Sequence, residues 1–203
     1  MPTAFIVIDD FLTDPAQLRS IAVAQEYPEL NEPTYFPGRN STKRVLLDGV
    51  DQVIQQIIGE PLVPATEDTA HGKFRIAFEG DRGTAGVHID NCDWSAILYL
   101  SLPEHCRGGT EFFRHRETGT DHAPFTGRDL KAMGFDSVEA LWTELIWPHT
   151  NDRSKWECTM QIPMRYNRLV LFRPQYWHDA GPGFGSSLDD GRLVYLLFYR
   201  NRK

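Results

Sequence analysis

The chain has 203 residues, of which 41% are hydrophobic and 24% charged, and its net charge is -7. This length fits one domain with a sizeable core, and the composition excludes a disordered or fibrous protein. Because 28 acidic residues outnumber 21 basic ones, the surface is poorly suited to phosphate backbones. We therefore expect a small-molecule or peptide partner and no binding to nucleic acid.

Residues 1–72 begin with one predicted strand and the first of two predicted helices. Residues 4–9 are apolar until two aspartates end the run, which indicates a short strand. Asp14 can cap a helix that begins at Pro15, and Gln17 occupies the position that completes a capping box. We expect this part of the chain to pack on the outside of a sheet.

A second helix and an aromatic loop complete the N-terminal region. Apolar residues recur at helical spacing over residues 50–58, Asp48 can cap this helix, and Gly59 can end it. Between the two helices, residues 35–41 form a predicted aromatic turn that carries one cation, Arg39. This turn is either a substrate loop or an ordinary packed turn.

From residue 73 onward, short runs rich in aromatic and β-branched residues predict strands. These runs are residues 73–78, 86–90, 94–102, 110–114, 156–164, 168–172 and 192–200. Because the helices come first and the strands later, the pattern predicts an α+β fold with a sandwich or barrel core over residues 73–200. The sequence offers no linker, so we expect a single domain spanning residues 1–203.

One polar segment, residues 119–153, interrupts the predicted strands. A helix is predicted at residues 136–146, with Asp136 and Glu139 in capping-box positions. The segment therefore reads as a helical insertion between core strands, and it forms either a lid over a site or a surface elaboration. We expect the strands to hold every metal and co-substrate ligand without it.

Three residues predict a metal site. His88 and Asp90 alternate along a predicted strand, so an imidazole and a carboxylate point to the same face. His178 follows the buried-looking strand 168–172 and a short turn. These side chains can form the two-histidine, one-carboxylate set that leaves coordination positions open on non-heme iron.

Arg192 opens a strand that is otherwise apolar, residues 193–199. An arginine is costly to bury without a counter-charge, and its planar fork suits a carboxylate held through two hydrogen bonds. The guanidinium is therefore expected to meet an anion. The alternatives are that it reaches the edge of the sheet or pairs with Asp189 or Asp190.

Taken in order, these patterns resemble the 2-oxoglutarate/Fe(II) oxygenases, most closely the prolyl-4-hydroxylase-like branch. The resemblance rests on His88-x-Asp90, Gly108-Gly109-Thr110-Glu111-Phe112, the strand before His178, and Gly191-Arg192, and it covers roughly residues 73–200. It implies a double-stranded β-helix, or jelly roll, flanked by the N-terminal helices. It also implies that His88, Asp90 and His178 bind Fe(II), with no further catalytic residue, and that Arg192 binds 2-oxoglutarate.

Two further positions follow from the resemblance. Thr110 is implied to line the co-substrate pocket, although in the family this threonine usually follows Gly-Gly-Glu and here it directly follows Gly-Gly. The family often has a tyrosine on the strand after His-x-Asp. The nearest alignment places Leu98 there and leaves Tyr99 one position out of phase.

The resemblance implies a dioxygenase that consumes O2 and 2-oxoglutarate and releases succinate and CO2. The apolar stretch at residues 4–8 has no basic flank, unlike a secretory signal, so we expect a cytoplasmic protein. We expect it to hydroxylate an unactivated C–H bond of an amino acid, a peptide or a small natural product, with Arg39, Trp94 and Trp177 as candidate substrate contacts. No apolar run reaches the roughly 20 residues of a membrane span, and the oligomeric state stays open. The alternatives are a non-catalytic jelly-roll binding or sensor protein and a cupin-type metalloenzyme that does not use 2-oxoglutarate.

The remaining histidines show no spacing that would place a ligand beside a partner on a strand. His115 and His122 flank the insertion, and His105 lies beside Cys106 in a predicted turn. We expect all three to be surface residues. The three cysteines have no paired spacing, so the sequence indicates neither a disulfide framework nor a thiolate zinc site.

Overall fold

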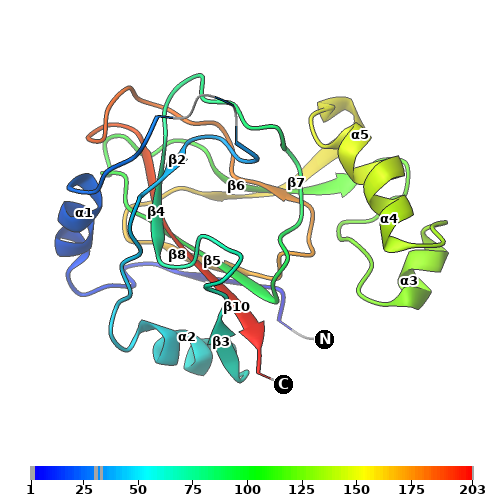
Figure 1. The fold of residues 1–203 in the computed structure, drawn as a ribbon, viewed down its shortest axis with the longest axis horizontal. Helices are drawn as coiled ribbons and strands as arrows, with labels where there is room; N and C mark the ends of the chain where they lie inside the picture. Colours follow the sequence, from blue (N-terminus) through cyan, green and yellow to red (C-terminus); the bar gives the residue numbers. More distant parts are fainter. Residues whose placement is uncertain (1–2, 30–31, 33, 203) are drawn as a thin grey trace.

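The computed structural model describes residues 3–29, 32 and 34–202, and arranges them as two antiparallel sheets with helices outside (Figure 1). The large sheet has the order β1 (Phe5–Ile8), β8 (Leu169–Phe172), β5 (Trp94–Tyr99), β10 (Arg192–Asn201), β4 (Lys73–Ala77) and β2 (Arg39–Asn40), and β3 (Leu62–Pro64) pairs with the end of β10. The small sheet has the order β7 (Trp156–Pro163), β6 (Gly109–His115) and β9 (His178–Asp179). The chain is therefore a mixed fold of antiparallel sheets with few helices.

The large sheet is buried on both faces. Helices α1 (Pro15–Val23) and α2 (Val50–Ile58) contribute to the core on its outer face, where Trp94, Ala96 and Leu98 of β5 also lie. Alternate residues of the same strand, Ile97 and Tyr99, belong to the core between the two sheets. The period of two along a strand thus sends neighbouring residues to different layers of the molecule.

The two N-terminal helices begin differently from each other. Asp14 accepts a hydrogen bond from the backbone N–H of Gln17 at 3.0 Å, as the sequence predicted for the start of α1. Asp48 does not cap α2. Gly49 occupies the N-cap with φ of 79°, a left-handed conformation that glycine adopts at little cost, and Gly59 closes the helix as predicted.

Several strand boundaries differ from the prediction. Residues 86–90 form no regular strand, and His88 makes only an isolated antiparallel bridge with His178. Residues 39 and 40, predicted to lie in a loop, pair with β4 as β2. The short strands β3 and β9 were not predicted, because two or three residues carry too little periodicity to be recognised.

The insertion is helical over more of its length than the sequence indicated. It contains α3 (Gly127–Ala132), α4 (Val138–Ala140), the π-helical η1 (Leu141–Ile146) and α5 (Trp147–His149), followed by the 3-10 turn η2 (Arg153–Lys155). Ser137, and not the predicted pair Asp136 and Glu139, caps α4 by accepting from the backbone N–H of Ala140 at 3.0 Å. The serine stands immediately before the first helical residue, where a side-chain cap can act.

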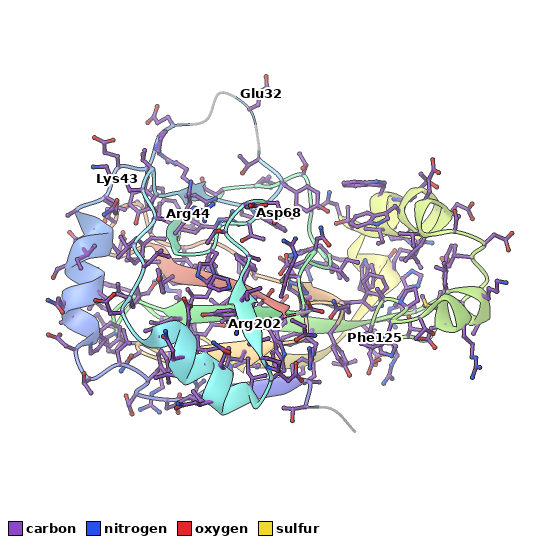
Figure 2. All side chains as sticks on the ribbon, turned by 60° about the horizontal axis from the view of Figure 1, so that its bottom comes forward. Glu32, Lys43, Arg44, Asp68, Phe125 and Arg202 are labelled. Atoms are coloured by element: carbon purple, nitrogen blue, oxygen red, sulfur yellow. The ribbon has the colours of Figure 1, made fainter. Side chains whose placement is uncertain are left out.

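The helices of the insertion form a group at one end of the molecule (Figure 1). Leu141, Leu145 and Ile146 pack with Val87 and Trp177 in a third core, and side chains fill the space between these helices and the sheets (Figure 2). This core joins the insertion to the segment that carries His88. None of the helices in the described residues is long and apolar enough to cross a membrane.

Candidate metal centre and its cavity

His88, Asp90 and His178 converge at the isolated bridge between the two histidines. One ligand atom from each lies within 4.8 Å of the others. His88 Nε2 lies 3.7 Å from Asp90 Oδ1, and His178 Nε2 lies 3.4 Å from Asp90 Oδ2. Two imidazoles and a carboxylate at this spacing match the donor set that the sequence predicted for non-heme iron.

Hydrogen bonds to the backbone orient both imidazoles. His88 Nδ1 lies 2.7 Å from the carbonyl oxygen of Gly86, and His178 Nδ1 lies 2.8 Å from that of Tyr176. Since a carbonyl can only accept, each Nδ1 carries the proton and donates. The lone pair of each neutral ring is then on Nε2, which faces the carboxylate, as in histidines that bind metals.

The charge states of His88 and Asp90 suit a cation. Burial lowers the pKa of His88, and the adjacent His178 lowers it further, so the imidazole stays neutral. Burial alone would raise the pKa of Asp90, but contacts with His178, His88 and Ser95 hold it well below its usual range. Ser95 donates to Asp90 Oδ2 at 2.7 Å. Neutral imidazoles beside an ionised carboxylate are the forms that bind a divalent ion.

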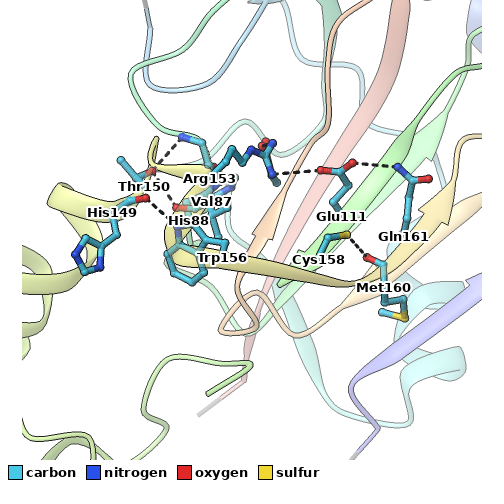
Figure 3. A network of polar contacts seen from close by, with 12 residues as sticks. Val87, His88, Glu111, His149, Thr150, Arg153, Trp156, Cys158, Met160 and Gln161 are labelled. Atoms are coloured by element: carbon cyan, nitrogen blue, oxygen red, sulfur yellow. Dashed lines mark hydrogen bonds and ion pairs between the residues drawn. The ribbon is translucent and has the colours of Figure 1, made fainter. Parts of the chain in front are cut away.

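Thr150 of the insertion holds the segment that carries His88 (Figure 3). Its hydroxyl accepts from the backbone N–H of Gly86 at 3.0 Å and donates to the carbonyl of Val87 at 2.9 Å. A Cβ on Gly86 would lie 2.6 Å from the carbonyl oxygen of Thr150, so the absence of a side chain permits this close approach. The metal-site segment is therefore fixed by an inserted residue and by β9.

Replacing Thr150 by valine is expected to weaken metal binding roughly 10- to 100-fold, the range typical of residues that orient metal ligands. Valine keeps the shape but leaves the Gly86 N–H and the Val87 carbonyl without the hydroxyl, and each unsatisfied buried group costs about 1–3 kcal/mol. Titration of Mn(II) and urea unfolding measure the two effects. Thr143→Val is the matched control, because the Thr143 hydroxyl bonds only within its exposed helix; equal metal affinity in both variants would contradict this role.

Arg192 is buried beside this centre at the start of β10, with 3% of its surface exposed. Its Nε and Nη2 atoms have no hydrogen-bond partner among the described residues. Burial lowers the pKa of the guanidinium, which nevertheless stays charged in proteins. An uncompensated buried cation is costly, so this side chain fits a carboxylate ligand, as the sequence predicted.

Tyr99 and Thr110 form a buried pair on the same inner layer. The two hydroxyl oxygens are 2.6 Å apart, and the backbone N–H of Thr110 donates to the Tyr99 hydroxyl at 3.0 Å. Tyr99 therefore faces inward, whereas Leu98 packs in the outer core. The alignment that preferred Leu98 was wrong by one position, and a one-residue shift reverses the face of every side chain in a strand.

A cavity of about 1060 Å³ opens over these residues. The predicted metal residues, Arg192 and Thr110 all line it. Tyr35 and Phe36 come from the predicted substrate loop, and the insertion supplies the apolar wall residues Val138, Trp142 and Trp147. Both segments thus lie beside the cavity, which lies at the upper end of the roughly 300–1,000 Å³ typical of small-molecule sites.

The three predicted substrate contacts do not line this cavity. Trp94 and Trp177 are fully buried in the outer core and in the insertion core, respectively. The guanidinium of Arg39 lies 5.2 Å from the centre of the Phe78 ring, and its neighbour Asn40 lines the cavity in its place. Side chains alternate between the two faces of a strand, and the sequence did not show which face of these strands meets the cavity. Trp94 and Arg39 were therefore assigned to the wrong face.

One cation that lines the cavity, Arg75, was missed by sequence reasoning. It belongs to β4, where it alternates with the buried Phe74 and Ile76. Its Nε donates to Asn40 Oδ1 at 2.8 Å, and its guanidinium lies 5.2 Å from the centre of the Phe36 ring. Burial, reinforced by Arg192, lowers the pKa of Arg75 to about 10. The alternation of basic and apolar residues in this strand was the signal that pointed to a polar inner face.

A second cluster joins His115, Glu117 and His149 away from this cavity. His115 is 1% exposed, so its prediction as a surface residue was wrong. Its Nε2 lies 2.9 Å from His149 Nδ1, and Lys155 forms an ion pair with Glu117. The histidines hydrogen-bond each other and a lysine neutralises the carboxylate, so the polar groups of the cluster already have partners. We therefore interpret the cluster as a structural link between β6 and the insertion.

Comparison with known proteins identifies a family and a fold. The model described as "Family of unknown function (DUF6445)" matches residues 2–198. No curated protein matches the chain.

Three solved structures are similar to this chain, and the first two identify its fold. HygX from Streptomyces hygroscopicus, with nickel and 2-oxoglutarate bound, has a TM-score of 0.55 and 13% identity over 98% of this chain and 84% of that chain. The non-heme alpha ketoglutarate dependent carbocyclase SnoK from nogalamycin biosynthesis has a TM-score of 0.53 and 16% identity, over 98% of this chain and 80% of that chain. A Pseudomonas putida prolyl-4-hydroxylase has a TM-score of 0.47 and 14% identity, over 98% of this chain and 94% of that chain. HygX and SnoK show that the fold is that of 2-oxoglutarate/Fe(II) oxygenases; the branch stays a prediction.

Proposed function

Because the chain belongs to the family of unknown function DUF6445, we propose its function from its own site: an Fe(II)- and 2-oxoglutarate-dependent dioxygenase. It would hydroxylate an unactivated C–H bond of an amino acid, a peptide or a small natural product. The observation that carries this proposal is that one cavity is lined by an inward-facing His-Asp-His set and by a buried arginine whose Nε and Nη2 have no partner among the described residues. We also propose that the chain is a single cytoplasmic domain whose core is a double-stranded β-helix.

The donor set fits iron(II), and Arg192 fits the co-substrate. His88 and His178 would bind through Nε2 and Asp90 through its carboxylate. Arg192 would bind the distal carboxylate of 2-oxoglutarate, and Thr110 would line the same part of the cavity. When bound, iron(II) and 2-oxoglutarate supply the oxidising chemistry that transfers an oxygen atom from O2 to a C–H bond, with release of succinate and CO2.

The protein's own residues would position the reactants and protect them from water. Gly86 and Tyr176 fix the imidazole rings through Nδ1, and Ser95 fixes one oxygen of Asp90. The aromatic residues of the loop and the insertion line the cavity and would exclude water from part of it. This rigid support matters because small displacements of a reacting group cost large factors in rate.

Succinate formation on addition of iron(II), 2-oxoglutarate and O2 tests the proposal. We expect slow succinate release from the protein alone and faster release with a substrate. Binding of 2-oxoglutarate without succinate would favour a binding or sensor protein. Oxidation of a substrate without 2-oxoglutarate would favour a cupin-type metalloenzyme.

The insertion and the loop at residues 35–41 would determine which substrate is accepted. The three candidate metal ligands lie outside the insertion, as expected, but Thr150 of the insertion supports the His88 segment. Deleting the insertion would therefore damage the metal site as well. A single wall residue provides a cleaner test than a deletion.

Trp147→Ala is expected to lower substrate-stimulated succinate formation roughly five- to tenfold with no change in iron content. Trp147 is 50% exposed at the cavity wall, and its ring lies 5.8 Å from that of Tyr35, so truncation removes an aromatic contact worth about 1 kcal/mol or more. Phe125→Ala is the matched control, since Phe125 is an exposed aromatic residue of the same insertion that does not line the cavity (Figure 2). Equal stimulation of succinate formation by the substrate in both variants would show that Trp147 does not contribute to substrate specificity.

A further inference from the structure

We propose that Arg75 binds an acidic group of the substrate, and that the substrate is an organic acid with a planar apolar body. This inference rests on the proposed function and names the substrate class of the same site. It assigns the outer of two arginines in the cavity to the substrate and the inner one, Arg192, to the co-substrate.

The position of Arg75 places its charge close to the metal centre. The Phe36 ring is close to both: its centre is 5.2 Å from the Arg75 guanidinium and 4.4 Å from the centre of the His88 ring. Only Nε of Arg75 has a hydrogen-bond partner in the part of the chain that the structure describes, namely Asn40. The terminal nitrogens are therefore available for a carboxylate, which a guanidinium fork binds through two hydrogen bonds.

The two arginines occupy different depths. In the sheet, Arg192 pairs with Ala77 and Arg75 pairs with Val194, so the guanidinium groups come from neighbouring strands two register positions apart. Arg192 is almost completely buried, whereas Arg75 is only partly buried. A co-substrate that must bind first and stay under the substrate suits the deeper arginine, and a group presented by the incoming substrate suits the outer one.

The charges in the cavity call for one further anion. With iron(II) and the dianion of 2-oxoglutarate bound, the two arginines and the metal outweigh Asp90 and the co-substrate by one positive charge. Of the other charged residues of the lining, Asp68 already forms an ion pair with Arg200 at 2.6 Å, and Lys73 adds a further positive charge. An excess of positive charge in a cavity attracts an anionic ligand, so an organic acid suits this site.

Part of the cavity wall is aromatic. The ring centres of Trp147 and Trp142 are 5.3 Å apart, and Tyr35 meets Trp147 edge-on at 5.8 Å. All three line the cavity. Flat apolar groups pack on such surfaces by stacking and edge contacts. The substrate class is therefore an acid whose apolar part rests on these rings while its carboxylate reaches Arg75.

Calorimetric titration of the Mn(II)- and 2-oxoglutarate-loaded protein with 3-(indol-3-yl)propanoate and its primary amide tests this inference. The acid is expected to bind at least tenfold more tightly than the amide. Arg75→Gln should reduce the affinity for the acid to that for the amide, and the dissociation constant of 2-oxoglutarate should shift less than threefold. Arg39→Gln makes the same charge change on β2 outside the cavity and should retain the preference for the acid.

Three results would overturn the inference. The first is a wild-type protein that binds the acid no better than the amide, including no measurable binding of either, and this result does not depend on whether a variant folds. The second is an Arg75→Gln protein that still prefers the acid. The third is an Arg75→Gln protein whose affinity for 2-oxoglutarate falls by as large a factor as its affinity for the acid, which would assign Arg75 to the co-substrate. Failure of the proposed function is distinguishable, because wild-type protein would then not bind 2-oxoglutarate with Mn(II).

Discussion

Replacing His178 by alanine is expected to abolish stoichiometric iron binding and succinate formation together. The substitution removes one of three ligand side chains that converge within 4.8 Å. Loss of a residue that merely orients a ligand costs about 10- to 100-fold in metal affinity, so loss of a ligand should cost more than about 100-fold. Iron content after desalting and titration with Mn(II) measure the effect.

The control for this variant is His122→Ala, which removes a partly exposed imidazole whose Nδ1 bonds the carbonyl of Ala123. We expect this protein to bind one iron per chain. Thermal unfolding of both variants without metal shows whether either has lost its fold. A folded His178→Ala protein with unchanged iron affinity would remove His178 from the metal site.

Replacing Arg192 by methionine is expected to raise the dissociation constant of 2-oxoglutarate at least about tenfold. A charge-assisted hydrogen bond contributes roughly 1.5–3 kcal/mol, and about 1.4 kcal/mol is a factor of ten. The same change should leave the ligand-free protein as stable or more stable, because it removes a buried cation whose Nε and Nη2 atoms lack partners in the described part of the chain.

Thermal unfolding with Mn(II), in the presence and absence of 2-oxoglutarate, measures both effects in one experiment. A ligand that binds only the folded state raises the unfolding temperature according to its affinity. Wild type and the control Arg39→Met should show this increase, and Arg192→Met should lose it. An equal increase in all three proteins would show that another cation binds the co-substrate.

The sequence determined the types of residues that make the candidate site. His88-x-Asp90, the histidine after a buried strand, and an arginine at the start of an apolar strand were readable because each places a polar group where an ordinary core strand has none. Most long strands were readable for a related reason, since runs of aromatic and β-branched residues between turns are typical of sheets.

Only the tertiary structure decided which face of each strand meets the cavity. β5 and β10 are apolar on both faces because both faces are buried. Their sequences therefore show no alternation of polar and apolar residues that would identify the face toward the cavity. Pairing in the sheet turned Tyr99 inward and Trp94 outward, and the pairing of β2 with β4 brought Asn40, and not Arg39, beside Arg75.

The support of the metal segment was also decided by the tertiary structure. Residues 86–90 resemble a strand in sequence, yet their regular pairing is limited to the His88 bridge, and the hydroxyl of Thr150, 64 residues beyond Gly86, satisfies the adjacent backbone groups. A local pattern cannot reveal a partner that far along the chain, because burial makes the hydrogen bond necessary without specifying which residue supplies it.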